Sequence, residues 1–398
     1  MPTIYFDHNA TTPLDSAVRE AMMGALGETF GNPSSIHHVG RRARVVLDEA
    51  RERVARVWAC RPSEVIFTSG GTESVNLAIF GTARRLRSQG RHLVTSAVEH
   101  HAVLHPLRYL AEREGFAVTH VPVDSNGRVD PADVQRALRQ DTTLVSVMAA
   151  NNEVGTIQPV AEIGRICAAA GVLFHTDAVQ WFGKEPFTSV RDFQADLVSL
   201  CAHKFHGPKG AGVLFLRSPL RLDPLLLGGA HEAEQRAGTE NLAAVLGLAE
   251  AMERFLKPPV FGVPEVGHWT RMLEDALLGI AGVFVHARGS AQGQRLCNTV
   301  AFSVEHCDSV ALLASLDLEG ICASGGAACS SGLLTPSHVL LAMGVPPPLA
   351  ASLIRFSLGR DSTAAEVRLV TEALPTIIRR VQQRGRLAPG AGGVATHR

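Results

Sequence analysis

Short apolar runs alternate with helix-like patterns through the first two thirds of the chain, and this alternation restricts the possible folds more than any other feature. Strands are predicted at residues 65–68, 92–96, 117–121, 144–149, 172–175, 197–201 and 212–216. Helices are predicted between them, at residues 74–89, 101–113, 131–139 and 161–170. Such alternation is typical of an α/β fold, in which helices cover both faces of a mostly parallel sheet. Because ligands bind such sheets beyond the carboxyl ends of the strands, we expect the functional side chains there.

The pattern changes near Lys257-Pro258-Pro259. A helix is predicted at 264–278, followed by shorter strands at 283–286 and 298–304 and a helix at 309–318. We therefore expect a large domain over residues 16–256. Residues 1–15 and 257–388 are expected to form a smaller α+β domain, and the Gly/Ala-rich residues 389–398 a disordered tail.

Composition excludes several classes of function. Of the 398 residues, 46% are hydrophobic and 19% charged, which permits a sizeable core. The formal net charge is zero without a basic block, which argues against nucleic acid. No apolar run approaches the ~20 residues that span a bilayer, and the start does not resemble a signal peptide. Seven scattered cysteines without a Cys-x-x-Cys pair favour a reducing cytoplasm and argue against an intrinsic metal site.

Lys204 is the strongest candidate for chemistry, because it directly follows a predicted buried strand in the segment 199–210. In a hydrophobic crevice the pKa of a lysine falls toward the neutral amine that a Schiff base requires. The alternative is a solvated surface lysine, since lysines are rarely buried. The other three lysines, Lys184, Lys209 and Lys257, lie in turn-like settings beside glycine or proline.

Other strand ends carry residues suited to binding an anion or a ring. Gly71 and Thr72 open a helix after a strand, where free amides hold phosphate, although on this fragment alone a plain tight turn is the better explanation. Asp177 could pair with a pyridinium nitrogen or only cap a helix. His100 could stack on a ring and move protons, and Asn152 could donate to a phenolic oxygen; ordinary loop roles remain open for both.

Two further candidates lie in the last quarter of the chain. Cys329 stands in a loop of small residues that leaves a thiol accessible for nucleophilic attack, or it is a turn cysteine without a role. Arg355 lies within an apolar run and needs an anion, either a structural carboxylate or that of a substrate.

Taken together and in order, these features resemble the cysteine desulfurases of the class V aminotransferase group. The resemblance runs from Tyr5-Phe6-Asp7-His8-Asn9-Ala10-Thr11-Thr12 to Arg355-Phe356-Ser357, and it includes Phe30-Gly31-Asn32-Pro33-Ser34-Ser35, His203-Lys204 and the Cys329 loop. Within the group, Arg236-Ala237-Gly238-Thr239-Glu240-Asn241 is most similar to the NifS branch, with the IscS branch second. His8, Ala202, Ala327 and Cys297 depart from the usual pattern of the group.

The resemblance implies a pyridoxal-phosphate enzyme of fold type I and assigns roles to individual residues. Lys204 would form the Schiff base, Cys329 would carry a persulfide, and His100 would stack on the cofactor ring. The remaining cofactor residues would be Gly71, Thr72, Asn152, Asp177, Gln180, Cys201, His203 and Thr239, the last reaching the phosphate in the partner of a homodimer. Asn32 and Arg355 would hold the substrate carboxylate.

The implied reaction removes sulfur from L-cysteine and releases L-alanine. The resemblance also implies that an iron–sulfur scaffold protein of the NifU or IscU type accepts the sulfur. Cys329 could contact an iron–sulfur cluster during this transfer. A link to nitrogenase maturation is a further possible implication. The alternatives are a selenocysteine lyase or an aminotransferase on the same fold, and a non-catalytic scaffold.

Overall fold

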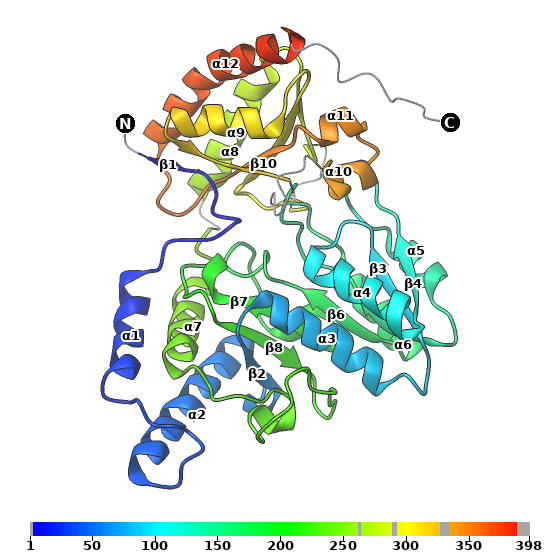
Figure 1. The fold of residues 1–398 in the computed structure, drawn as a ribbon, viewed down its shortest axis with the longest axis vertical. Coiled ribbons are helices and arrows are strands. Elements are labelled where there is room, and N and C mark those ends of the chain that lie inside the picture. The colour runs from blue at the N-terminus through cyan, green and yellow to red at the C-terminus, as the bar shows by residue number, and fades with distance from the viewer. Residues whose placement is uncertain (1–2, 262–263, 289–292, 327–334, 388–398) are drawn as a thin grey trace.

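The computed structural model describes residues 3–261, 264–288, 293–326 and 335–387, which form two lobes (Figure 1). The lower lobe is built on a seven-stranded sheet in the order β2-β8-β7-β6-β5-β3-β4. The strands are β2 (Val65–Thr68), β3 (His92–Ser96), β4 (Ala117–Val121), β5 (Thr142–Ser146), β6 (Leu173–Asp177), β7 (Leu197–Cys201) and β8 (Gly212–Leu216). Only β8 runs antiparallel to its neighbours, so the sheet is mixed and mostly parallel, as predicted.

Both faces of this sheet are buried, which explains the continuous apolar strands. Successive side chains of a strand point to opposite faces, and Leu93 and Val94 accordingly join two different hydrophobic clusters. The covering helices are α3 (Gly71–Arg85), α4 (His101–Glu114), α5 (Pro131–Ala137), α6 (Val160–Ala170) and α7 (Leu242–Phe255). Helices α1 (Ser16–Leu26) and α2 (His38–Trp58) pack on α7 (Figure 1).

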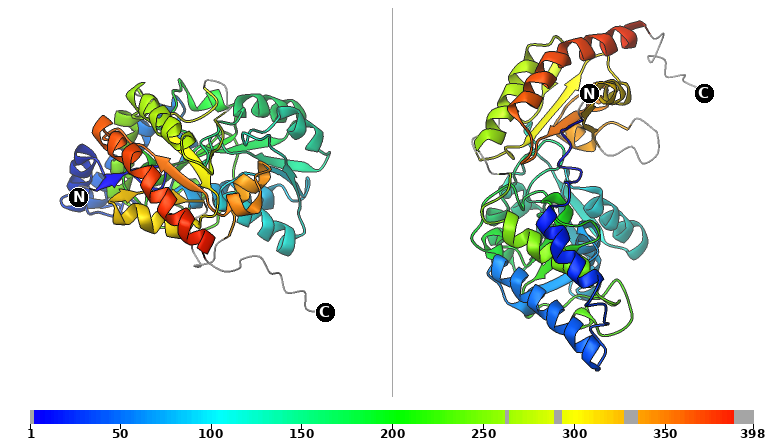
Figure 2. Two further views of the ribbon diagram at one scale, coloured as in Figure 1. Left: turned by 90° about the horizontal axis from the view of Figure 1, so that it is seen from above. Right: turned by 90° about the vertical axis from the view of Figure 1, so that its left-hand side faces the viewer.

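The upper lobe has an antiparallel sheet in the order β12-β13-β10-β9. Its strands are β9 (Val283–Val285), β10 (Thr299–Val304), β12 (Ser324–Gly325) and β13 (Ile354–Ser357), and β1 (Ile4–Tyr5) pairs separately with β11 (Ile321–Cys322). Helices α8 (Pro264–Leu278), α9 (Ser309–Leu318) and α12 (Ala364–Leu387) pack against this lobe, with α10 (His338–Ala342) and α11 (Pro347–Ala350) on its lower side (Figures 1 and 2).

One hydrophobic cluster joins the start of the chain to its last third. Ile4 and Phe6 pack in the same cluster as Val266, Phe356 and Leu374 of the upper lobe. This cluster supports the predicted division into residues 16–256 and residues 1–15 with 257–388, which we retain as a proposal. No helix of the described residues is long and apolar enough to cross a membrane.

Five of the seven strands of the large sheet begin and end where the sequence predicts. The other two, β5 and β6, are displaced by about two residues: the apolar residues after β5 were taken as part of the strand, and β6 ends with the polar residues Thr176 and Asp177. Six helices of the described residues, α1, α2, α7, α10, α11 and α12, lie where the sequence led us to assign no element.

Candidate active site

The segment 7–12 passes from the upper lobe to the lower lobe (Figure 1) and contacts the residues that follow β7. The Thr12 hydroxyl donates to the His203 carbonyl oxygen over 2.9 Å. Lys204 lies in a single 3-10 turn, Ala202–Lys204, directly after β7. Its Nζ donates to the carbonyl oxygens of Asn9 and Ala10 over 2.7 and 2.8 Å. The N-terminal segment therefore forms one wall of the site around Lys204.

The environment of Lys204 favours a neutral amine. Burial lowers the pKa of Lys204, and the Arg355 guanidinium lowers it further, while Cys201 and Asp177 oppose the shift. Lys204 forms no ion pair with a carboxylate of the described residues. Lys204 is partly buried and donates to two backbone carbonyl oxygens of the N-terminal segment, so it is not the solvated lysine of the alternative interpretation.

Asp177 is the last residue of β6 and is only 6% exposed. Burial raises the pKa of its carboxyl to about 6, with the charge of Lys204 opposing the shift. Its Oδ1 accepts the amide of Val179 over 3.0 Å, so it also makes the capping-type contact of the alternative interpretation. Gln180, a few residues further, is buried and donates from Nε2 to the Asn9 carbonyl oxygen over 2.9 Å.

The amino end of α3 lies beside these groups. A Cβ atom added to Gly71 would come within 2.8 Å of the Val179 side chain and 3.6 Å of Cys201 Sγ, so only glycine allows this close approach. The first amides of a helix have no partner within the helix and suit an anion. Thr72 is exposed in the first turn. His203 contacts the Thr11 hydroxyl over 3.1 Å, and burial with the charge of Lys204 lowers its pKa to about 4.

His100 and Asn152 follow two other strands, β3 and β5. His100 caps α4, where its Nδ1 accepts the amide of Ala102 over 3.1 Å. Desolvation and the charge of Lys204 lower the pKa of His100 to about 4, so its ring is neutral near neutral pH. The carbonyl oxygen of Asn152 accepts Nη1 of Arg355 over 2.7 Å.

Arg355 enters the site from β13 of the upper lobe and is 5% exposed. Its Nη2 pairs with Asp7 Oδ1 over 2.7 Å, and its Nε has no partner among the described residues. Asp7 is therefore the structural anion of the first alternative for Arg355, and Nε remains as a donor for a second anion. Asn32 lies exposed before α2, and its Oδ1 accepts the amide of Ser34 over 2.9 Å within its own loop.

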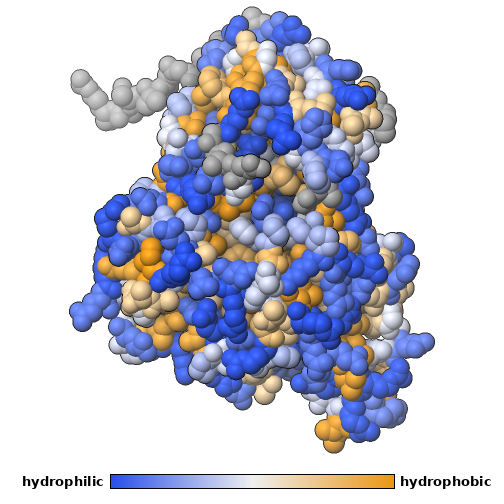
Figure 3. Space-filling model, turned by 180° about the vertical axis from the view of Figure 1, so that it is seen from behind, coloured by the Kyte–Doolittle hydropathy of each residue, from blue (hydrophilic) through white to orange (hydrophobic). Residues whose placement is uncertain are grey.

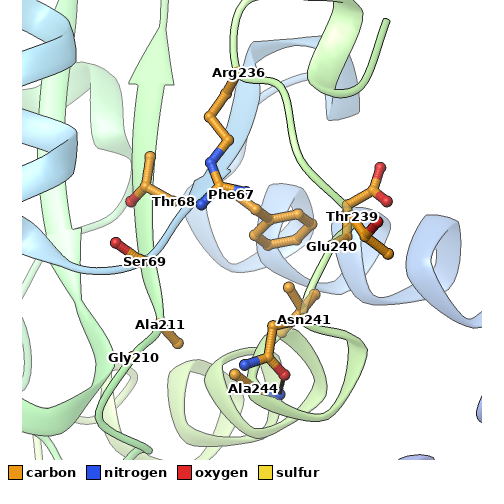
Figure 4. Close-up of a pocket in the computed structure, with 11 residues that line it drawn as sticks. Phe67, Thr68, Ser69, Gly210, Ala211, Arg236, Thr239, Glu240, Asn241 and Ala244 are labelled. Atoms are coloured by element: carbon orange, nitrogen blue, oxygen red, sulfur yellow. Dashed lines mark hydrogen bonds between the residues drawn. The ribbon is translucent and has the colours of Figure 1, made fainter. Parts of the chain in front are cut away.

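Thr239 lines a pocket of about 220 Å³ between the end of β2, the turn before β8 and the loop before α7 (Figure 4). Ser69, Arg236 and Asn241 also line it, and Arg236 forms an ion pair with Glu73 of α3 over 2.8 Å. Thr239 is exposed and lies close in space to the loop that begins α3. Cys329 lies outside the described residues.

Sequence reasoning missed two contributors to this site. Lys184 was expected in a turn and lies in one, but it is 1% exposed and donates to Gln180 Oε1 over 2.6 Å. Its spacing of four residues from Gln180, across the apolar pair Trp181-Phe182, was the available signal. Asp7 and Asn9 were recognised only as part of a motif, because long-range pairing with Arg355 and Lys204 cannot be predicted from local sequence.

Known proteins resemble this chain over nearly its full length. The family model described as aminotransferase class V matches residues 4–370. The cysteine desulfurase IscS of Dictyoglomus turgidum is 44% identical over 383 residues, which cover 95% of each chain. The cysteine desulfurase NifS of Azotobacter vinelandii is 42% identical, covering 95% of this chain and 93% of that one. A solved NifS-like protein superposes with a TM-score of 0.87 at 37% identity, over 95% of this chain and 100% of that one.

Proposed function

This chain belongs to the class V aminotransferase family, and from that premise we propose that it is a cysteine desulfurase, a sulfurtransferase that depends on pyridoxal phosphate. The observation that carries the proposal is the full-length similarity to IscS and NifS together with a partly buried Lys204 directly after β7. Both branches match at nearly equal identity, so the sequence comparison alone does not favour a nitrogenase-related role over a general one.

The residues of the site fit pyridoxal phosphate. Asp177 is a buried carboxylate without an ion-pair partner among the described residues, as a pyridinium nitrogen would require. Lys204 has the lowered pKa of a Schiff-base lysine. Gly71, Thr72, Cys201 and His203 would surround the phosphate at the amino end of α3, His100 would lie over the ring, and Gln180 and Asn152 would reach its polar edge.

The bound cofactor supplies an electron sink for the carbanion at the substrate Cα. The chain supplies the groups around it. Lys204 is placed to take and return the Cα proton, because its pKa is lowered by burial. Asp177 would hold a proton on the ring nitrogen by its negative charge. His100, neutral near neutral pH, is available to accept or donate a proton at the substrate.

Arg355 would hold the carboxylate of L-cysteine. Its Nε is without a partner among the described residues, while Asp7 and the Asn152 carbonyl oxygen fix the other two nitrogens. A guanidinium held in this way is oriented before substrate binds, and that reduces the entropy lost on binding. Asn32 lies in the loop between α1 and α2, at the end of the lower lobe far from β13 (Figure 1), and its contact with the substrate carboxylate stays a proposal from the family resemblance.

Cys329 is proposed as the sulfur carrier. Its thiolate attacks the substrate sulfur, a new S–S bond forms, and the Cβ–S bond of the substrate breaks with its electron pair returning to the substrate carbon skeleton. Protonation of that carbon gives L-alanine, and Cys329 keeps the sulfur as a persulfide. An iron–sulfur scaffold protein of the NifU or IscU type would then receive the sulfur in the cytoplasm.

A homodimer is proposed, with Thr239 completing the cofactor site of the partner. The lower lobe exposes large apolar side chains near this position: Leu227 is 84% exposed, and its neighbour Leu226 accepts the amide of Ala237 through its carbonyl oxygen. Large apolar side chains are also exposed on the loop before α2, among them Phe30 and Ile36. On the face in Figure 3, apolar residues form small patches separated by hydrophilic ones. The loop around Thr239 is therefore a suitable contact for a second copy.

Incubation of the purified chain with pyridoxal phosphate and L-cysteine tests the proposal. We expect L-alanine to form without a keto-acid acceptor, and sulfide to appear when a thiol reductant is present. Alanine formation only with an added keto acid would identify an aminotransferase instead. Turnover of selenocysteine but not cysteine would identify a selenocysteine lyase. A chain that binds no cofactor at all would instead be a non-catalytic scaffold.

A further inference from the structure

Lys184 is a second buried lysine beside the candidate site. It is 1% exposed, and no carboxylate of the described residues pairs with it. Its Nζ donates to Gln180 Oε1 over 2.6 Å and lies 5.5 Å from the centre of the Phe261 ring. Burying an amine without a carboxylate is costly, so a purely stabilising role does not explain the residue.

The contact with Lys184 fixes the orientation of the Gln180 amide. A lysine side chain in its charged form has three N–H donors and no acceptor, whereas the glutamine amide has one carbonyl and one NH₂ end of similar shape. Lys184 therefore requires the carbonyl end of Gln180, which leaves the NH₂ end for the site. One N–H of that end reaches the Asn9 carbonyl oxygen over 2.9 Å, and the other is left to donate.

These contacts join both lysines through Asn9. The Asn9 carbonyl oxygen accepts Gln180 Nε2 and also Lys204 Nζ, over 2.9 and 2.7 Å. Lys184 thus contacts Gln180, and Gln180 contacts the Asn9 carbonyl oxygen, which also accepts Lys204 Nζ. A displacement of Gln180 would change one of the two acceptors that hold Lys204.

We propose that Lys184 is a positioning residue that turns the N–H donor of Gln180 toward the phenolic oxygen of bound pyridoxal phosphate. The inference rests on the proposed function, since it names the group that receives this hydrogen bond. Burial, with the charges of Lys204 and Arg355, lowers the pKa of Lys184 to about 7. The charged form of Lys184 enforces this orientation of Gln180, because a neutral amine also has a lone pair that can accept from the NH₂ end.

Matched substitutions test the proposal. Lys184→Met and Lys184→Gln give side chains of similar size, but only the second keeps an N–H donor. We expect Lys184→Met to shift the absorption maximum of bound pyridoxal phosphate and to weaken its binding about 3- to 10-fold, the value of one hydrogen bond. Lys184→Gln should retain the wild-type absorption maximum. Lys257→Met is the control, because Lys257 is exposed, donates to the carbonyl oxygens of Val57 and Thr188 and lies over the Phe187 ring.

Two changes at Gln180 complete the test, and the first does not depend on the folding of Lys184→Met. Gln180→Glu keeps an acceptor for Lys184 but removes the N–H donor, so it should reproduce the spectral shift. A double variant of Lys184→Met with Gln180→Leu should bind no more weakly than Gln180→Leu alone.

Any one of four results would overturn the proposal. Lys184→Met could have the wild-type spectrum, or Lys184→Met and Lys184→Gln could show equal shifts. Gln180→Glu could have the wild-type spectrum, or the losses of binding in the double variant could be additive. A wild-type chain that binds no pyridoxal phosphate would instead refute the proposed function and the inference with it.

Discussion

Replacing Asp177 with asparagine should stabilise the cofactor-free chain while it abolishes turnover. Asparagine has the same shape and keeps the oxygen that accepts the Val179 amide, so the change removes chiefly the charge. The pKa of Asp177 is raised from 3.8 to about 6 in the folded chain by burial. An acid whose pKa is higher in the folded chain than in the unfolded chain lowers the free energy of unfolding when it is ionised. This loss of stability is absent at pH values below the unfolded pKa, grows between the two pKa values and is complete above the folded pKa.

The magnitude follows from that shift. With 1.36 kcal/mol per pKa unit, the penalty is about 1.5 kcal/mol near pH 5 and about 3 kcal/mol near pH 8. The free energy of unfolding in urea, measured at pH 5 and pH 8 for the cofactor-free wild type and for Asp177→Asn, tests this penalty. We expect the variant to be the more stable protein, and by a larger margin at the higher pH. A variant that is less stable at both values, or a margin independent of pH, would refute the account of Asp177 as a carboxylate held for a cationic ring.

Three further predictions concern the site and the assembly. Lys204→Ala should lose the visible absorbance of bound pyridoxal phosphate, and a retained borohydride-reducible band would refute the assignment. Arg355→Ala should raise the KM for cysteine about 10- to 100-fold, the value of a charge-assisted hydrogen bond, while the cofactor band survives; loss of the cofactor with normal cysteine binding would make Arg355 structural. Sedimentation should find a homodimer, and a monomer with full activity at high dilution would exclude a shared site around Thr239.

Local patterns predicted the strands and the residues that follow them. β7 is a buried apolar run that ends at Cys201, so the position of Lys204 follows from the sequence of one strand. The same reasoning placed Asp177 at the end of β6 and Gly71 at the start of α3. These positions depend on neighbouring residues only, which is why they could be predicted.

Contacts between distant segments could not be predicted in the same way. Asp7 contacts Arg355, and Asn9 contacts Lys204, only because the chain returns to the N-terminal segment after 348 and 195 residues, respectively. The burial of Lys184 has the same origin, since the Phe261 ring that covers it belongs to the connection between the lobes. Helix α7 was not predicted, because ten of its fourteen residues are buried and its charged residues, Glu250, Glu253 and Arg254, stand only in its second half.

The location of the transferred sulfur tests the central claim most directly. The chain is loaded with pyridoxal phosphate, exposed briefly to L-cysteine, alkylated and analysed by mass spectrometry of its peptides. We predict one added sulfur atom on Cys329, and none in Cys329→Ser, which should still bind the cofactor but release no alanine. Sulfur on Cys201 or Cys322, or normal alanine release by Cys329→Ser, would contradict the account.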